Sequence, residues 1–306
     1  MRASTSISMK ILRGGASEEV VEDEYEVELP DDPVAVQGDI YQLGRHRLMC
    51  GDSTILDDVE KLLDGRKAAL VITDPPYNMN YEGGGGTRDR KEKRIPNDNL
   101  PEQEFAEFLR TVLSNYYITM EDGASIYCFY KELGGGVFLN ALRASGLTFK
   151  QVLIWVKNQI VLGGSKYQGM HEPCMFGCKG KVGKWHGARK QRSVIESIDL
   201  MSEEDLKNAI RELLDMEMTD ILRENKPLKN DLHPTMKPIR LLAKLIGNSS
   251  DKDDVVLDLF GGSGSTMIAA EQTGRDAYLM ELDPKYVDVI VDRWQKFTGQ
   301  KAVKVS

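Results

Sequence analysis

Four consecutive residues, Asp74-Pro75-Pro76-Tyr77, offer a definite chemistry directly after the apolar run 69–73. The Asp74 carboxylate and the Pro75 carbonyl oxygen, held in place by the proline rings, would present two hydrogen-bond acceptors close together. Such a pair suits an exocyclic amino group, whose two hydrogens must be accepted before the nitrogen lone pair can point at an electrophile. Tyr77 would stack on the base that carries this amino group. An ordinary strand-to-turn junction is the competing interpretation, because Asp-Pro-Pro also favours turns.

A second candidate site is the glycine-rich segment 258–266, which the sequence places between a strand and a helix. Glycines at a strand end allow a ligand to approach the backbone closely. The spacing of Gly261, Gly262 and Gly264 matches neither G-x-G-x-x-G nor a Walker motif, so it predicts neither a nicotinamide-type site nor a P-loop. Glu281 lies 20 residues after Gly261 (281 − 261), where an acid can accept both ribose hydroxyls of a nucleoside cofactor.

The elements that would position these two segments alternate along most of the chain after Gly38. Strands are predicted over 69–73, 124–130, 148–157, 255–260 and 277–280. Helices are predicted over 101–116, 136–145, 202–224, 238–247, 266–274 and 284–298. This alternation predicts an α/β fold, a doubly wound and mostly parallel Rossmann-like sheet with helices on both faces.

The tetrapeptide 74–77 and the segment Phe260-Gly-Gly-Ser-Gly-Ser265 together resemble the catalytic and cofactor motifs of S-adenosylmethionine-dependent DNA amino-methyltransferases. The catalytic motif comes first, which is the order of the β class of that family, whose methyltransferase sheet is circularly permuted. The resemblance extends from Gly38 to Thr298. Four further segments match in order: Cys50-Gly-Asp-Ser53, Leu153-Ile-Trp-Val-Lys-Asn158, His171-Glu-Pro-Cys174 and His233-Pro-Thr-Met-Lys-Pro238.

The resemblance implies that residues 74–77 bind the target amino group and stack on a base flipped out of the duplex. Asp52 would reach the adenine amino group of the cofactor, and Thr235 and Lys237 would meet its methionine carboxylate. The implied cofactor-binding set is Asp52, Thr235, Lys237, Asp258, Phe260, Gly261, Gly262, Gly264 and Glu281. The implied reaction is direct in-line transfer of a methyl group from S-adenosyl-L-methionine to N6 of adenine in duplex DNA, with no metal and no covalent enzyme intermediate.

The net charge of −8 is unusual for a protein that binds DNA, but the charge is unevenly distributed. Residues 1–32 hold nine acids and three bases, so the remainder is nearly balanced. Local basic patches govern contact with phosphates, and solvated loops are their alternative interpretation. The predicted DNA-binding residues are Arg88, Arg90, Lys91, Lys93 and Arg94 in one cluster, and Lys184, Trp185, His186, Arg189, Lys190 and Arg192 in another. The glycine run 83–86 beside the first cluster predicts a loop that closes over the DNA.

The chain divides into four predicted regions. Composition sets off an acidic flexible tail over 1–36, and the resemblance implies the other three: a catalytic half of the methyltransferase domain over 37–178, a target-recognition insertion over 179–230, and a cofactor-binding half over 231–306. Because no apolar run is long enough to span a bilayer and the N-terminal residues lack a secretion signal, a cytoplasmic protein with four reduced cysteines is expected.

The cysteines and histidines suggest two other kinds of site. Cys174 follows a proline, as does the nucleophile of cytosine-C5 methyltransferases, but its other neighbours do not fit that class. A zinc site formed by His171, Cys174, Cys178 and His186 is conceivable, although their spacing matches no usual pattern. We therefore expect neither a nucleophilic cysteine nor a metal.

Several choices of substrate and partner stay open at this stage. Aspartate in the first position of the tetrapeptide favours adenine, and the N4 position of cytosine is the alternative. Methylation of RNA or of protein amides would use similar motifs, and a catalytically silent DNA-binding module is the alternative outside enzymes. The apolar stripe over 202–224 would pack on the parent domain or form a homodimer. Duplex DNA is the expected macromolecular partner.

Overall fold

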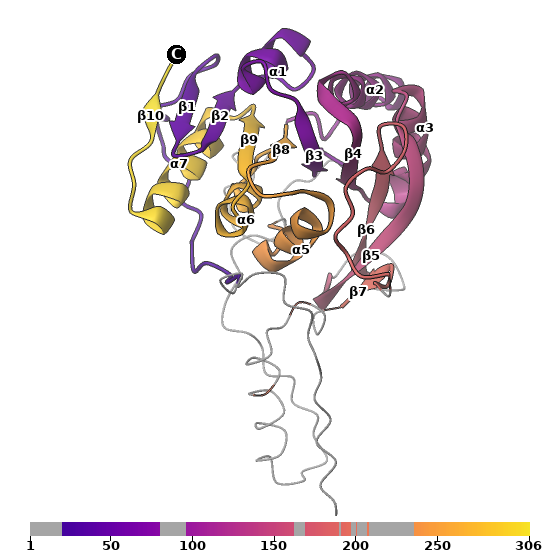
Figure 1. Cartoon of the computed structure of the whole chain (residues 1–306). Coiled ribbons are helices and arrows are strands. Elements are labelled where there is room, and N and C mark those ends of the chain that lie inside the picture. Colours follow the sequence, from indigo (N-terminus) through magenta and orange to yellow (C-terminus); the bar gives the residue numbers. More distant parts are fainter. Residues whose placement is uncertain are drawn as a thin grey trace, which may run out of the picture.

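The computed structural model describes residues 20–79, 96–161, 169–189, 191–196, 200, 207 and 236–306. Strands and helices alternate through these residues (Figure 1). The strands are β1 (Ile40–Leu43), β2 (His46–Cys50), β3 (Ala68–Thr73), β4 (Met120–Phe129), β5 (Thr148–Val161), β6 (Gly169–Cys178), β7 (Val194–Ile195), β8 (Val255–Asp258), β9 (Asp276–Glu281) and β10 (Val303–Lys304). The helices are α1 (Leu56–Leu63), α2 (Glu102–Thr119), α3 (Gly135–Ala144), α5 (Ile239–Ser249), α6 (Ser265–Thr273) and α7 (Pro284–Thr298), with a 3-10 turn η1 (Glu132–Gly134).

The described strands form one sheet in the order β10-β1-β2-β9-β8-β3-β4-β6-β5-β7. The five strands from β2 to β4 in that order are all parallel to one another. Antiparallel strands extend the sheet on both sides, β1 and β10 beyond β2, and β6 and β5 beyond β4. We call the end at which the five parallel strands finish the carboxyl edge, and the opposite end the amino edge.

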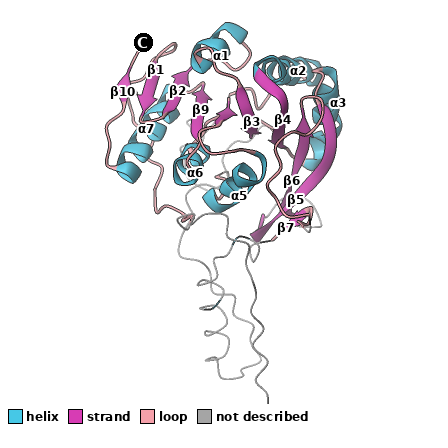
Figure 2. Ribbon diagram, viewed as in Figure 1, coloured by secondary structure: helices cyan, strands magenta, loops and turns pink. Residues whose placement is uncertain are grey.

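Helices cover both faces of the sheet, as Figure 2 shows. One hydrophobic core joins the sheet to α5, α6 and α7, and a second core joins its other face to α1, α2 and α3. The predicted doubly wound α/β fold is therefore confirmed. Among the described helices, none has the length and apolar character that a membrane crossing requires.

Local sequence explains the best-predicted elements. All six residues of β3 are buried, as expected for a strand with helices on both faces. Helix α7 begins at Pro284, and its N-cap Asp283 accepts a hydrogen bond of 2.9 Å from the Lys285 amide. The same helix ends at Gly299, which has a φ of 71°.

Strand β6 was missed by the sequence analysis. Its sequence contains Gly169, Pro173 and Gly177, which are residues that disfavour strands. The strand nevertheless pairs antiparallel with β4 on one side and β5 on the other, with Pro173 opposite Ile154. A Cβ atom on Gly177 would lie 3.0 Å from the Thr148 carbonyl oxygen, so glycine permits this close pairing. Tertiary contacts therefore override local propensity here.

Of the predicted acidic tail over residues 1–36, whose flexibility stays a prediction, the structure describes residues 20–36. This segment has no regular secondary structure, but it lies against α5, α6 and α7. Its acids have specific partners, because Asp23 forms an ion pair with Arg293 of α7. Some of the acidic residues of this segment therefore serve to bind groups of the folded domain, in addition to any that are solvated.

Several predictions fall outside the described residues. They concern the glycine loop 83–86, the helix 202–224, and the residues Arg88, Arg90, Lys91, Lys93, Arg94, Lys190 and Thr235.

Candidate active site

Four acids selected from the sequence meet at the carboxyl edge of the sheet. Asp74 follows β3, Asp258 ends β8, Glu281 ends β9, and Asp52 comes two residues after β2. The helices that follow β3 and β8 cover opposite faces of the sheet, and these two strands are neighbours. Ligands of open α/β sheets bind at such a reversal, outside the carboxyl ends of the strands. The fold therefore brings the tetrapeptide and the glycine segment together, although they are far apart in sequence.

Asp74 has a fixed environment on both of its carboxylate oxygens. Its Oδ1 accepts a hydrogen bond from the Tyr77 hydroxyl, and its Oδ2 lies 2.5 Å from Lys237 Nζ. The Tyr77 ring meets Phe138 of α3 edge-on, with centroids 6.4 Å apart. Lys237 Nζ also lies 4.9 Å from the centre of the Phe129 ring. The carboxylate of the tetrapeptide is thus held by a buried lysine that comes just before α5.

Two residues of this cluster had no assigned role in the sequence analysis. Glu172 of β6 accepts hydrogen bonds from Tyr77 at 2.9 Å and from Lys237 at 2.7 Å, both on Oε1. Lys157 of β5 lies 2.6 Å from the other oxygen, Oε2. We call Asp74, Tyr77, Lys157, Glu172 and Lys237 the lysine cluster. Glu172 and Lys157 both lie in segments that resemble the family. The sequence signal that could have indicated them is a charged residue within an otherwise apolar stretch.

The lysine cluster contains two carboxylates and two ammonium groups, and its electrostatics separate the two acids. Burial raises the pKa of Glu172, but Lys237 and Lys157 outweigh it and bring the value to about 2. Burial also raises the pKa of Asp74; Lys237 opposes this rise and the charge of Glu172 adds to it, so the pKa stays above its usual value. Although burial lowers the pKa of Lys237, Asp74 and Glu172 together raise it. Asp74 is therefore the more basic of the two acids.

The glycine segment forms a tight turn between β8 and α6. Asp258 is buried and organises this turn, because its Oδ1 accepts from the Phe260 amide at 3.1 Å and its Oδ2 from the Thr266 hydroxyl at 2.7 Å. Gly264 has a φ of 85°, which favours glycine. A Cβ atom on Gly261 would lie 3.0 Å from Ile290 Cδ1, so the turn packs closely on α7. We call residues 258–266 the cofactor turn.

Glu281 closes the other side of the cofactor turn. Its Oε2 accepts from the Gly262 amide at 2.8 Å, and its Oε1 accepts from the Asp283 amide at 3.0 Å. Burial raises the pKa of Glu281 to about 7 and that of Asp258 to about 8. Asp52 lies on the neighbouring strand end, where its Oδ1 accepts from the amide and hydroxyl of Thr54. Phe260 packs edge-on against Phe108, with ring centroids 6.1 Å apart.

The structure places two of the predicted DNA-binding residues away from this site. Lys184 Nζ lies 2.7 Å from Asp254, and His186 Nε2 lies 3.0 Å from Asp251. Both acids precede β8 and therefore lie at the amino edge, opposite the lysine cluster. Lys184 and His186, at the start of the second predicted basic cluster, thus pair with acids of the same domain. The contact of Lys184 and His186 with DNA stays a prediction, but both side chains have acidic partners away from the lysine cluster.

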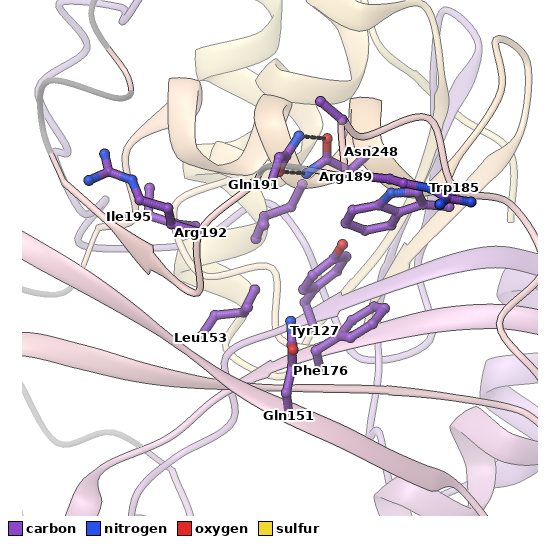
Figure 3. Close-up of a pocket in the computed structure, with 12 residues that line it drawn as sticks. Tyr127, Gln151, Leu153, Phe176, Trp185, Arg189, Gln191, Arg192, Ile195 and Asn248 are labelled. Atoms are coloured by element: carbon purple, nitrogen blue, oxygen red, sulfur yellow. Dashed lines mark hydrogen bonds between the residues drawn. The ribbon is translucent and has the colours of Figure 1, made fainter.

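Three other predicted DNA-binding residues, Trp185, Arg189 and Arg192, line a cavity of about 150 Å³ (Figure 3). The cavity lies between the sheet, the segment 185–195 and the end of α5. A pair of hydrogen bonds of 2.8 and 2.9 Å between the Gln191 and Asn248 amides joins two of these elements. At about 1.5 Å per residue, the length of α5 separates Asn248 from Lys237, so the cavity is not the site of the lysine cluster.

The alternative cysteine and histidine sites receive no support from the geometry. Cys174 is buried, and burial raises its pKa well above the usual value, which disfavours the thiolate that a nucleophile needs. His171 pairs with Glu132 at the carboxyl edge, whereas His186 pairs with Asp251 at the amino edge. These histidines therefore lie apart rather than around a common centre.

Solved structures share the fold at low sequence identity. The M1.HpyAVI–SAM complex has a TM-score of 0.53 and 20% identity, covering 80% of this chain and 98% of that one. The PvuII DNA methyltransferase, which is cytosine-N4-specific, has a TM-score of 0.56 and 16% identity, covering 89% of this chain and 94% of that one.

Sequence relatives lead to the same family. The type II methyltransferase M.HinfI of Haemophilus influenzae is 27% identical over 263 residues, covering 79% of this chain and 68% of the relative. M.BglII of Bacillus subtilis is 22% identical, covering 76% of this chain and 66% of its own length. Residues 68–292 match the family model for N6/N4 DNA methylases, which is well over half of the chain. The chain therefore belongs to the N6/N4 DNA methylase family.

Proposed function

We propose that this DNA methyltransferase transfers a methyl group from S-adenosylmethionine to N6 of adenine in duplex DNA, on a base flipped out of the helix. The observation that carries the proposal is the position of Asp74 at the carboxyl edge, beside the Pro75 carbonyl and next to the cofactor turn. The methyl donor is S-adenosylmethionine, whose sulfonium supplies an electrophilic methyl group when it is bound.

The residues of the lysine cluster divide the work on the target base. Asp74 and the Pro75 carbonyl accept the two amino hydrogens, so that the nitrogen lone pair is free to form the new bond to carbon. As this bond forms, the bond between the methyl carbon and sulfur would break and leave its electron pair on a neutral thioether. The nitrogen gains a positive charge, and one of its protons then passes to the Asp74 carboxylate. A raised pKa suits Asp74 to that task. Tyr77 offers its ring for stacking while its hydroxyl stays bonded to Glu172.

The cofactor turn has the hydrogen-bond acceptors and the acids that a nucleoside cofactor with a positive charge needs. Glu281 accepts two backbone amide hydrogens here and can accept ribose hydroxyls in the same plane. Burial raises the pKa values of Asp258 and Glu281, and neither carboxylate has an ion-pair partner among the described residues, which favours a ligand that brings positive charge. In the proposed complex, Gly261, Gly262 and Phe260 line the cofactor and Asp52 reaches its adenine amino group.

The role proposed for Lys237 changes with the geometry. The resemblance assigned it to the methionine carboxylate of the cofactor, but its ammonium group pairs with Asp74 and Glu172. We propose that Lys237 orients the Asp74 carboxylate toward the target amino group. It is thus a positioning residue on the substrate side of the site.

The choice between adenine and cytosine rests on the first residue of the tetrapeptide. Aspartate favours N6 of adenine, and a relative of the same fold acts on N4 of cytosine. Mass analysis of nucleosides from DNA treated with enzyme and labelled cofactor separates the two: we expect N6-methyladenine, and N4-methylcytosine would overturn the choice of base.

The DNA interface is proposed to include the loop 83–94 and the insertion 179–230. Arg189 and Arg192 stay candidates because both are exposed on the insertion. Methyl transfer by the purified chain would exclude the alternative of a silent DNA-binding module.

Replacement of Asp74 by alanine tests the proposed function. We expect methyl incorporation from labelled cofactor into duplex DNA to fall by about 10³-fold, because the amino group loses its charged acceptor. Cofactor binding, measured by calorimetry, should change little. The matched control is Asp122→Ala, which removes an exposed carboxylate near the amino edge. Unchanged incorporation in the Asp74 variant would refute the proposed function.

A further inference from the structure

The N-terminal segment 20–37 makes several contacts with the cofactor-binding half of the domain. Val21 exchanges two hydrogen bonds with the Gln272 side chain of α6, at 2.8 and 2.9 Å. The amides of Val34 and Ala35 donate to Asp288 of α7 at 2.6 and 3.0 Å. The segment is therefore attached near both of its ends, and its acids Glu22 and Asp23 belong to the first of these attachments.

Glu22 caps the helix that follows Lys237. One carboxylate oxygen accepts from the Ile239 amide and the other from the Arg240 amide, both at 2.9 Å. These are the first two amides of α5, which have no partner within the helix. The residue before the helix, Pro238, provides no side-chain cap. Glu22 therefore satisfies the helix start and adds a favourable charge to its positive end.

Asp23 reaches the cofactor turn through one arginine. Its carboxylate forms a two-pronged ion pair with Arg293, with distances of 2.6 and 2.7 Å. Arg293 is only 1% exposed, and its Nη1 donates to the Ser263 carbonyl at 2.8 Å and the Ser265 hydroxyl at 3.2 Å. A guanidinium that is this deeply buried depends on its carboxylate partner. Asp23 thus fixes the position of Arg293, and Arg293 in turn donates hydrogen bonds to the cofactor turn.

We propose that Glu22 and Asp23 are positioning residues for methyl transfer, Glu22 acting on Lys237 through the start of α5 and Asp23 acting on the cofactor turn through Arg293. The proposal rests on the proposed function, because it assigns the two targets to catalysis and to cofactor binding. The two acids are consecutive in the chain, so one extended segment supports both halves of the site. The effects of the two acids can be measured separately, because the contacts of Glu22 lead to Lys237 and those of Asp23 lead to the cofactor turn.

The two chains of contacts predict effects on different quantities, the cofactor Kd for Asp23 and the methyl-transfer rate for Glu22. In Asp23→Asn, Arg293 loses its charged partner and the cofactor turn loses its support, so we expect the cofactor Kd to rise about tenfold. The methyl-transfer rate at saturating cofactor should stay close to that of the wild type. In Glu22→Gln, the cofactor Kd should stay the same, and the single-turnover rate should fall about fivefold because Lys237 is less well placed.

The experiment uses the full chain with S-adenosylmethionine and duplex DNA. Cofactor Kd is measured by calorimetry and the methyl-transfer rate by single-turnover assay, with a thermal melt for each variant. Glu24→Gln is the matched control, because it removes an exposed acid from the same segment. Asp23→Glu and Glu22→Asp, which keep the charges, should recover most of the lost function.

The outcomes distinguish the possible failures. A wild-type protein that neither binds the cofactor nor methylates DNA refutes the proposed function itself. If the wild type is active and each variant weakens cofactor binding and slows methyl transfer together, in proportion to its loss of thermal stability, the segment has only a structural role and the inference is overturned. Variants identical to Glu24→Gln in both measurements overturn it as well.

Discussion

The lysine cluster and the cofactor turn lie at the same edge of one sheet, yet they treat buried carboxylates differently. In the lysine cluster, Glu172 contacts two ammonium groups and has a pKa of about 2. In the cofactor turn, the hydrogen bonds of Asp258 and Glu281 come from amides and a hydroxyl, and burial raises their pKa values to about 8 and about 7. Among the described residues, neither forms an ion pair with a lysine or arginine.

The lysine cluster therefore contains the counter-charges of its own acids, whereas the acids of the cofactor turn would receive a counter-charge from the ligand. A buried ion pair with good geometry keeps its charges without help, so the lysine cluster is organised before the base arrives. Buried acids without cations stay partly protonated near neutral pH and favour a ligand that brings positive charge and hydroxyl donors. The contrast fits a preorganised catalytic group beside a cofactor site that is completed by binding.

Among the changes that compare these two regions, the largest effect is expected from Glu172→Gln, which removes one charge from the lysine cluster. Lys237 would then interact with Asp74 alone and Tyr77 would lose an acceptor, so we expect kcat to fall by about 10- to 100-fold. The negative charge of Glu172 raises the pKa of Asp74, so its removal should move the acid limb of the kcat profile to lower pH. Steady-state kinetics across pH, with cofactor Kd from calorimetry, provide the measurement.

A control variant sharpens this comparison. Lys157→Met removes the outer ammonium group and leaves the contacts of Glu172 with Lys237 and Tyr77 in place, so its effect on kcat should be smaller. If Glu172→Gln changed cofactor affinity instead of kcat, the division between the two regions would be incorrect.

An intermediate effect is expected from pH on cofactor binding. In the proposed complex, Glu281 accepts ribose hydroxyls as a carboxylate, and burial raises its pKa to about 7 before binding. Affinity should therefore be highest above pH 7, and Kd should rise by up to about tenfold per pH unit below it, because one proton must be released. Calorimetry between pH 5.5 and 8.5 measures this slope, where both limits are about one and a half units from the pKa.

Glu281→Gln provides the internal reference for the pH measurement. A glutamine cannot titrate, so the dependence of Kd on pH should flatten while binding weakens. A steep slope that persists in this variant would assign the proton to another group, for which Asp258 is the nearest candidate.

The smallest effect is expected from Lys184→Ala at the amino edge. Its ion pairs with Asp254 and Asp251 are partly exposed, and such pairs contribute about 0–1 kcal/mol. We expect DNA affinity and its salt dependence to stay within twofold of the wild type, and a thermal melt to show a small loss. Arg189→Ala is the contrasting variant and should reduce the salt slope by about one. A large loss of DNA affinity in Lys184→Ala would return this edge to the DNA interface.

The central fold was predictable because its strands and helices have strong local signals. The buried run of β3 and the Asp283-Pro284 start of α7 lie where the sequence analysis placed them. Strand β6 was not predictable in this way, since Gly169 and Pro173 oppose it locally and only pairing with β4 and β5 defines it. The same pairing brings Glu172 to the site, which explains why that residue was missed.

Charge patterns were the least reliable guide. Lys184 and His186 were predicted to bind DNA, and Glu22 and Asp23 to lie in a flexible tail, yet all four have partners in the same domain. A charge has no sequence-local signature that distinguishes an intramolecular partner from solvent or phosphate. Only the packing of distant segments decides between them.

The sequence by itself determined the family, the order of the two motifs and the residue types that carry the chemistry, because these depend on short contiguous segments. The tertiary structure alone decided that Lys237 and Glu172 belong to the environment of Asp74, and that Lys184 does not lie beside the site. The physical reason is that ion pairs form through space between segments far apart in the chain: Asp74 and Lys237 are 163 residues apart, and Asp23 and Arg293 are 270 apart. The helix and strand propensities of a segment do not indicate which distant segment it will contact.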